Sequence, residues 1–155
     1  MDLFLIQHGE AKSEAEDPER SLTEYGAGTV RQMAAWAAQA RVKVGQIRHS
    51  GKKRAEQTAV LLADRLNPIL GIQAVAGLNP NDDARPVAEA LQQEQGPLML
   101  VGHLPFLSRL AGLLVVGDPE RAVVTFRQAG ITCLAREESQ WTVRWVMLAE
   151  HLKGS

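Results

Sequence analysis

Two short apolar runs constrain the fold more than any other feature of this sequence. Leu3-Phe4-Leu5-Ile6 and Leu98-Met99-Leu100-Val101 contain no polar residue, and each is followed within a few positions by a glycine and a histidine. Continuous apolar runs of this length are typical of strands in a parallel sheet that is covered on both faces. Segments with helical periodicity lie between the two runs. The sequence therefore predicts an α/β domain with a mainly parallel sheet.

Periodicity and turn signals place the other elements. Helices are expected over residues 21–40, 52–66 and 85–95, with a fourth that begins at Pro105. Further strands are expected at 44–47, 72–75, 130–135 and 141–148, with residues 137–140 as a hairpin turn. Ser21 is the predicted N-cap of the first helix, because Glu24 follows it as in a capping box. The predicted fold is a three-layer α/β sandwich with helices on both faces and an antiparallel hairpin at one edge.

Composition favours one globular domain over residues 1–155. The chain is 45% hydrophobic and 23% charged, and a chain of this length buries about 70% of its unfolded surface. Its 17 Lys+Arg against 18 Asp+Glu give a net charge of −1, which lacks the basic excess of a nucleic-acid-binding surface. No apolar run approaches the ~20 residues that cross a bilayer, and the N-terminus lacks the basic region of a signal peptide. We expect a cytoplasmic protein with no membrane or nucleic-acid partner.

Cysteine and tryptophan are interpreted as core residues. Cys133 is the one cysteine, which excludes an intramolecular disulfide and a multi-cysteine zinc site. On a predicted strand it is expected to be a small buried hydrophobe. Trp141 and Trp145, four positions apart, are expected on the same face of the last strand, in the core.

Two of the four histidines occupy equivalent places. His8 and His103 each follow a predicted buried strand. Alone, either one is more often a hydrogen-bonded structural residue than a functional one. Ligands of α/β sheets bind beyond the carboxyl ends of the strands, so two histidines at those ends indicate a site. His49 and His151 are expected at the surface.

A basic segment, Arg48 to Arg54, enters the second predicted helix. A run of this kind is often only a solvated basic face. Together with the two histidines, however, it predicts an anion site, because helix N-termini attract anions and Arg binds phosphate oxygens in a bidentate manner. A histidine there could attack phosphorus and carry a phosphoryl group, while cations stabilise the transferring oxygens.

Four segments, in order along the chain, resemble the motifs of the histidine phosphatase superfamily. The family patterns are Arg-His-Gly after the first strand, Leu-Thr-x-x-Gly, Ser-Pro-x-x-Arg-Ala-x-x-Thr-Ala and Gly-His-x-Pro. The corresponding segments here are LFLIQHGEA at 3–11, SLTEYG at 21–26, HSGKKRAEQTA at 49–59 and VGHLP at 101–105. Residues 141–148 resemble the closing strand of the short SixA-like branch, the phosphohistidine phosphatases. Each motif is modest alone, whereas the ordered set is specific and covers nearly the whole chain.

The resemblance implies a role for each matching residue. His8 would be the nucleophile that accepts the phosphoryl group, and Arg54 and His103 would hold its oxygens. No metal and no cofactor are implied. The substrate-binding residues implied by the resemblance are Gln7, Gly9, Ser50 and Arg54.

The resemblance also implies a phosphorylated protein as partner, such as a histidine phosphotransfer protein in a signalling relay.

Larger relatives use an acidic residue after the third strand as general acid. Asp82 and Asp83 are the weak candidates here, since a solvated turn is the simpler interpretation. A phosphoramidate whose imidazole is protonated has a better leaving group than an alkyl ester and needs less help from an acid. A general phosphomonoesterase for small molecules is the alternative.

One position departs from the pattern in a way that bears on activity. Gln7 stands where the family has its signature arginine, and an amide brings neither charge nor a rigid fork. Losing a charge-assisted hydrogen bond costs about 1.5–3 kcal/mol, or about 10- to 150-fold in rate. Lys12, Lys52 or Arg48 could supply replacement charge. Otherwise the chain is a pseudo-enzyme that binds phosphate or a phosphoprotein without turnover. Gly51 for the family proline loosens a turn and is expected to be tolerated.

Overall fold

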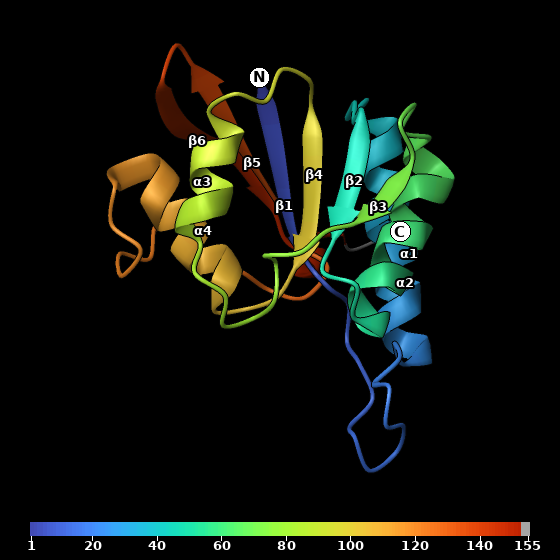
Figure 1. Cartoon of the computed structure of the whole chain (residues 1–155). Helices are drawn as coiled ribbons and strands as arrows, with labels where there is room; N and C mark the ends of the chain where they lie inside the picture. The colour runs from blue at the N-terminus through green and yellow to red at the C-terminus, as the bar shows by residue number, and fades with distance from the viewer. Residues whose placement is uncertain (153–155) are drawn as a thin grey trace.

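The computed structural model describes residues 1–152 and is built on a six-stranded sheet with the strand order β3-β2-β4-β1-β5-β6 (Figure 1). The strands are β1 (Asp2–Gln7), β2 (Gln46–His49), β3 (Ile72–Ala74), β4 (Leu98–Gly102), β5 (Ile131–Glu137) and β6 (Gln140–Met147). The first four are parallel, and β5 runs antiparallel to both of its neighbours. The predicted mainly parallel sheet with an antiparallel hairpin at its edge is confirmed.

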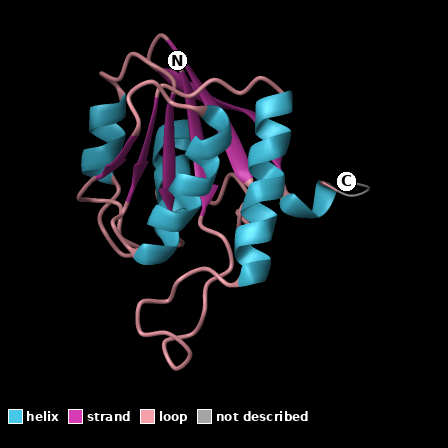
Figure 2. Cartoon of the chain, turned by 90° about the vertical axis from the view of Figure 1, so that its right-hand side faces the viewer, coloured by secondary structure: helices cyan, strands magenta, loops and turns pink. Residues whose placement is uncertain are grey.

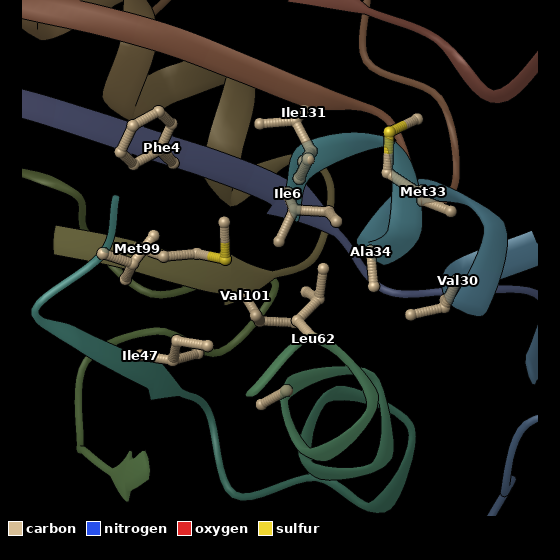
Figure 3. Packing of buried hydrophobic residues seen from close by; sticks show 14 of the residues in the cluster. Phe4, Ile6, Val30, Met33, Ala34, Ile47, Leu62, Met99, Val101 and Ile131 are labelled. Atoms are coloured by element: carbon tan, nitrogen blue, oxygen red, sulfur yellow. The ribbon is translucent and has the colours of Figure 1, made fainter. Parts of the chain in front are cut away.

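Helices cover both faces of this sheet, as Figure 2 shows. They are α1 (Glu24–Gln39) and α2 (Lys53–Leu66) on one face, α3 (Arg85–Leu91) and α4 (Phe106–Val116) on the other, and a short 3-10 turn, η1 (Ala149–His151). Side chains alternate across each strand, so Ile6 packs under α1 and α2 while Leu5 packs under α3 and α4. Figure 3 shows Ile6 of β1 in the first of these cores, together with Met33 of α1 and Leu62 of α2.

Several predicted boundaries were wrong by a few residues. Thr23, rather than Ser21, is the N-cap of α1, and its hydroxyl accepts from the Gly26 N–H at 2.9 Å. Ser21 instead hydrogen-bonds the carboxylate of Asp17 in the preceding loop. α3 ends at Leu91 rather than at residue 95, and β2 begins at residue 46 and extends to residue 49.

The two tryptophans of β6 do not share a face, which corrects the prediction from their spacing. A β-bulge lies between two pairs of β5 and β6, Cys133 with Trp145 and Leu134 with Val143. One extra residue reverses the side-chain alternation beyond it. Trp145 therefore stacks against Phe4 on the α1 side, at 6.0 Å between ring centroids, whereas Trp141 is buried on the α4 side.

The connections of β1 and β4 position the functional residues. From β1 the chain passes through α1 to β2, beyond β4, and from β4 it passes through α4 to β5, beyond β1. These neighbouring strands thus lead away in opposite directions, which opens a crevice at their carboxyl ends. The loop after β1 projects beyond those ends (Figure 1).

Two further predictions can be compared with the structure. Cys133 is buried at 1% exposure, as expected, and burial raises the pKa of its thiol to about 11. His151 is exposed, as expected. Among residues 1–152, the helices are too short or too polar to cross a membrane.

Candidate active site

The crevice between β1 and β4 brings two histidine rings together. His8 directly follows β1 and His103 directly follows β4, and the backbone N–H of His8 donates to the Gly102 carbonyl at 3.1 Å. The ring centroids are 5.0 Å apart, with the planes tilted by 55°. Both side chains are buried, at 8% and 2% exposure. The pairing of β1 with β4 thus brings together two histidines that are far apart in the sequence.

The His8 ring is held in one tautomer. Its Nδ1 lies 2.7 Å from the Gly9 carbonyl oxygen, and a carbonyl only accepts, so Nδ1 carries the proton. Burial lowers the pKa of His8, and the charges of Arg54 and Arg20 lower it further against the opposing hydrogen bond to Gly9. The ring is therefore neutral near pH 7, with a lone pair on Nε2. That nitrogen is the nucleophile that the geometry makes available.

The backbone N–H of Gly9 is already hydrogen-bonded within the protein, and it connects the loop after β1 to α2. Its N–H donates to the Thr58 hydroxyl at 3.1 Å, and that hydroxyl donates to the Arg54 carbonyl at 2.8 Å. A Cβ on Gly9 would lie 2.8 Å from Cγ2 of Val30, so only glycine lets the loop pass this close to α1. The backbone beside the nucleophile is thereby tied to the first turn of α2. Thr58, which sequence reasoning left without a role, makes the connection.

His103 is also neutral but has different partners. Its Nε2 lies 2.6 Å from the Ser50 Oγ, and its Nδ1 is buried with no hydrogen-bond partner among residues 1–152. Burial, followed by the charges of His8 and Arg54, lowers the pKa of His103 to about 3. An unpartnered buried nitrogen is costly unless a ligand satisfies it. This ring is therefore placed to hydrogen-bond a group that enters beside His8.

Two arginines lie beside the histidines. Arg54 is in the first turn of α2, and its Nε is buried without a partner. Arg20 is in the loop before α1. Burial is the largest cause of the lowered pKa values of Arg54, His8 and His103, and the charge of Arg20 is a smaller cause of each. Within residues 1–152 neither guanidinium forms an ion pair. Arg20 was missed because a single basic residue in a polar loop carries no sequence signal.

A polar basin of about 580 Å³ opens between these arginines. Its lining combines cations with three carboxylates; the residues are Glu14, Pro18, Glu19, Arg20, Gly51, Lys52, Lys53, Arg54 and Glu56. A larger cavity, about 810 Å³, lies elsewhere, between the end of α1 and β6, and none of the predicted site residues lines it. Of the predicted site residues, Arg54 lines the basin, whereas His8 and His103 are not among its lining residues.

Gln7 ends β1, opposite Gly102 of β4, and directly precedes His8. Its side chain is half-buried, and its Oε1 is buried without a partner. Of the proposed replacements for the missing charge, Arg48 pairs with Glu94 at 2.8 Å and lines a different cavity. Lys52 lines the basin and contributes to the low pKa of His103, chiefly caused by burial.

The acidic candidates occupy turn positions. The Asp82 carboxylate accepts from the Asn79 N–H at 2.9 Å, and Asp83 accepts from the Arg85 N–H at 3.1 Å. Neither residue lines the basin. These contacts agree with a turn role for both.

His49 was expected at the surface, and this prediction was wrong. It is 4% exposed, and its Nδ1 accepts from the Gly51 N–H at 3.0 Å, shaping the turn that leads into α2. His49 is the last residue of β2, two positions after Ile47, so its side chain leaves the sheet on the same face as that of Ile47. In the described part of the chain, no three His, Cys, Asp or Glu side chains gather as a metal site requires.

Comparison with known proteins identifies the fold. No protein-family model and no curated protein matches the sequence. Among solved structures, the protein histidine phosphatase SixA complexed with tungstate is 28% identical, with coverage of 99% of this chain and 100% of that chain, at a TM-score of 0.88.

Two further structures show the same fold at lower identity. SixA from Agrobacterium tumefaciens is 22% identical, covering 95% of this chain and 97% of its own, at a TM-score of 0.76. Phosphoserine phosphatase from Entamoeba histolytica, in complex with 3-phosphoglyceric acid, is 16% identical, covering 97% and 98%, at a TM-score of 0.75. The chain has the histidine phosphatase fold, with SixA proteins among its neighbours.

Proposed function

We propose that this chain, which has the histidine phosphatase fold, is a phosphatase that hydrolyses phosphohistidine in a protein through a covalent intermediate on His8. One observation carries the proposal. A neutral histidine with a free Nε2 faces a second neutral histidine, beside two arginines without carboxylate partners. A phosphoryl group supplies the negative charge that such an arrangement lacks.

The geometry supports two chemical steps. In the first, Nε2 of His8 attacks phosphorus, a new P–N bond forms, and the bond to the substrate imidazole breaks. That imidazole, protonated on its other nitrogen, leaves neutral and takes the bond electrons. In the second step, water attacks the phosphoryl group, the P–Nε2 bond breaks, and inorganic phosphate departs with the oxygen of water.

The hydrogen bond from His8 to Gly9 serves both steps. With Nδ1 protonated, phosphorylated His8 is a cationic phosphoimidazole, whose ring is a good leaving group for the attack by water. The Gly9 carbonyl, 2.7 Å from Nδ1, holds this proton in place. Arg54 and the Nδ1 of His103 are placed to stabilise the oxygens during each transfer.

Phosphohistidine is favoured as substrate because Glu10 and the two acids considered from the sequence, Asp82 and Asp83, are engaged in other hydrogen bonds. Glu10 accepts a hydrogen bond from the Thr23 hydroxyl at 2.7 Å, and the carboxylates of Asp82 and Asp83 accept hydrogen bonds from backbone N–H groups of their own turns. An alkyl phosphate needs an acid to protonate its leaving oxygen, whereas a protonated phosphoimidazole does not. The basin is lined by the loop after β1 and is open to solvent, which suits a phosphorylated protein.

The test is phosphate release from a phosphohistidine-labelled protein, with an aryl phosphate as the second substrate. We expect release by the native chain, preference for the phosphoprotein, and no release by His8→Ala. His151→Ala, an exposed histidine far along the chain, is the matched control and retains activity. A reaction with labelled phosphate that is quenched in alkaline detergent is expected to leave acid-labile, base-stable label on the native chain only.

Other outcomes would contradict the proposal in distinct ways. Preference for the aryl phosphate would indicate a general phosphomonoesterase. Phosphate or phosphoprotein binding without release would indicate a binding module, consistent with the uncharged Gln7. Release that survives in His8→Ala would exclude His8 as the nucleophile.

A further inference from the structure

Gln7 leaves a phosphoryl site with one fewer cation than the family pattern, so the charge of the entering group needs another partner. A phosphoryl group carries about −1.5 to −2 at pH 7. Both histidines are neutral there, because burial and neighbouring charges lower their pKa values. Arg54 supplies one positive charge that acts on both rings. A second cation at the same place would complete the balance.

Arg20 occupies that place from a different part of the chain. It lines the basin together with Arg54. Burial is the largest cause of the lowered pKa values of His8, His103 and Arg54, and the charge of Arg20 lowers each of them further. Lys52, the other basin cation with an effect on a histidine, acts on His103 only. Arg20 is thus the one loop cation whose field reaches both rings.

The loop holds Arg20 in a defined position. Its Nε donates to the Lys12 carbonyl at 3.1 Å, and its N–H donates to the Asp17 carbonyl at 2.9 Å. Its backbone is left-handed, at φ 51°, a strained conformation for a residue other than glycine. Asp17 also binds the N–H of Ser21, which closes the turn. The side chain is therefore directed by its own loop, while its two terminal nitrogens have no hydrogen-bond partner within residues 1–152.

Arg20 and Arg54 repel one another, and within residues 1–152 no carboxylate pairs with either. Glu14, Glu19 and Glu56 line the same basin but form no ion pair with them. Two unpaired guanidiniums at one cavity are unfavourable unless an anion lies between them.

We propose that Arg20 is the second phosphoryl-binding cation of this site and replaces, from the loop before α1, the arginine that Gln7 lacks. This inference rests on the proposed function and specifies which residues share the negative charge. The two guanidiniums approach the phosphoryl oxygens from α2 and from the loop, with His103 completing the set. The site thus keeps the charge of its family pattern with a different residue.

The test measures affinity for inorganic phosphate and tungstate by calorimetry, alongside kcat/KM on the phosphohistidine protein. Arg20→Gln is expected to weaken oxyanion binding and kcat/KM by about 10- to 100-fold. Arg41→Gln is the matched control. Arg41 is also an arginine with a left-handed backbone, at φ 61°, but it lies just beyond the far end of α1, about 24 Å along the helix axis. It should change both quantities by less than about twofold.

Two more variants separate charge from loop anchoring. Arg20→Lys keeps the charge but loses the Nε donor to Lys12, so it should retain more affinity than Arg20→Gln. In a Gln7→Arg background, Arg20→Gln should cost less than in the native chain, because the two cations serve the same oxygens. Equal losses in Arg20→Lys and Arg20→Gln, without rescue by Gln7→Arg, would mean that Arg20 only anchors the loop and would overturn the proposal.

The remaining outcomes distinguish this inference from the proposed function. If the native chain binds oxyanions and turns over while Arg20→Gln matches it, the inference is wrong and the proposed function stands. A loss in Lys52→Gln with none in Arg20→Gln would transfer the role to Lys52. If the native chain neither binds oxyanions nor releases phosphate, both fail together.

Discussion

The Ser50 hydroxyl oxygen lies 2.6 Å from Nε2 of His103, and this contact decides which ring nitrogen carries the proton. Ser50 Oγ also accepts the N–H of Lys52 at 3.3 Å, which leaves its own proton free to donate to Nε2. The proton of the neutral His103 ring is then on Nδ1, the nitrogen without a partner. Ser50 therefore positions the His103 ring, while its predicted role in binding substrate stays a prediction.

The first prediction concerns these tautomers. We expect both His8 and His103 to be Nδ1–H tautomers at pH 7, His8 because of the Gly9 carbonyl and His103 because of Ser50. Long-range ¹H–¹⁵N correlation spectra report this directly, since a protonated nitrogen resonates at lower frequency than a bare one. In Ser50→Ala the His103 tautomers should become mixed while His8 is unchanged. An Nε2–H tautomer for His103 in the native chain would contradict the assignment.

The second prediction concerns Gln7. Gln7→Arg should raise kcat/KM by about 10- to 100-fold, because a charge-assisted hydrogen bond contributes about 1.5–3 kcal/mol. Gln7→Glu is nearly the same size and should abolish turnover, since it places a negative charge beside the phosphoryl oxygens. Initial rates on the phosphohistidine protein check both. A Gln7→Arg variant with tighter phosphate binding but no turnover would favour the binding-module interpretation.

The third prediction concerns Thr58, which joins Gly9 to Arg54. Thr58→Val has the same shape but leaves the buried Gly9 N–H without a partner, which costs about 1–3 kcal/mol of folding free energy. It also releases the backbone beside His8, so kcat should fall more than KM rises. Thr58→Ser keeps the hydroxyl and should retain most of the activity. Urea unfolding and steady-state kinetics measure the two effects; equal activity in Val and Ser variants would show that the link is dispensable.

The fourth prediction follows from the lowered histidine pKa values. The pKa of His103 is about 3 in the folded chain and about 6.5 in the unfolded chain. Between these pH values the unfolded chain binds a proton at His103 and the folded chain does not. Stability is therefore full above pH 6.5 and falls as the pH drops below it, by up to about 1.4 kcal/mol per pH unit for this histidine. His103→Gln should reduce the difference in unfolding free energy between pH 7 and pH 5 by about 1–2 kcal/mol. The exposed His151→Gln should leave that difference unchanged.

His8 sets the pH dependence of activity in the same range. Because burial and then Arg54 and Arg20 lower its pKa, kcat/KM should stay constant down to the ordinary histidine value near 6.5 and decline below it. Removing the charge in Arg20→Gln should move this decline to higher pH. A decline already present above pH 7 in the native chain would show that another group controls activity.

The sequence predicted the sheet and the histidine pair because both depend on local patterns. Apolar runs of four residues mark β1 and β4, and the residues that follow such strands meet at one edge of the sheet. The face of Trp145 could not be predicted, because a single bulge in β6 reverses it and no residue type announces the bulge. Burial of His49 depends on neighbours from β4 and β3 that periodicity does not identify.

Arg20 shows the same limit within the site. Its position depends on the Asp17 turn and on the Lys12 carbonyl, that is, on how one loop closes. The polar composition of residues 11–20 predicts a loop, but nothing in that composition indicates where the side chain of Arg20 lies. The basic residues that did stand out, Arg48 and Lys52, were prominent because they are clustered in the sequence.

The strand order has a consequence for how the site comes into existence. β4 is made after β1, β2 and β3, yet it lies between β2 and β1 in the finished sheet. A growing chain that has not reached residue 103 carries His8 just after β1 and Arg54 just after β2, without a complete β4 between those two strands. Insertion of the fourth strand brings these groups together and delivers His103 in the same event. Under the proposed mechanism, phosphoryl transfer therefore requires the completed sheet, so an interrupted chain would contain the early motifs and lack the activity.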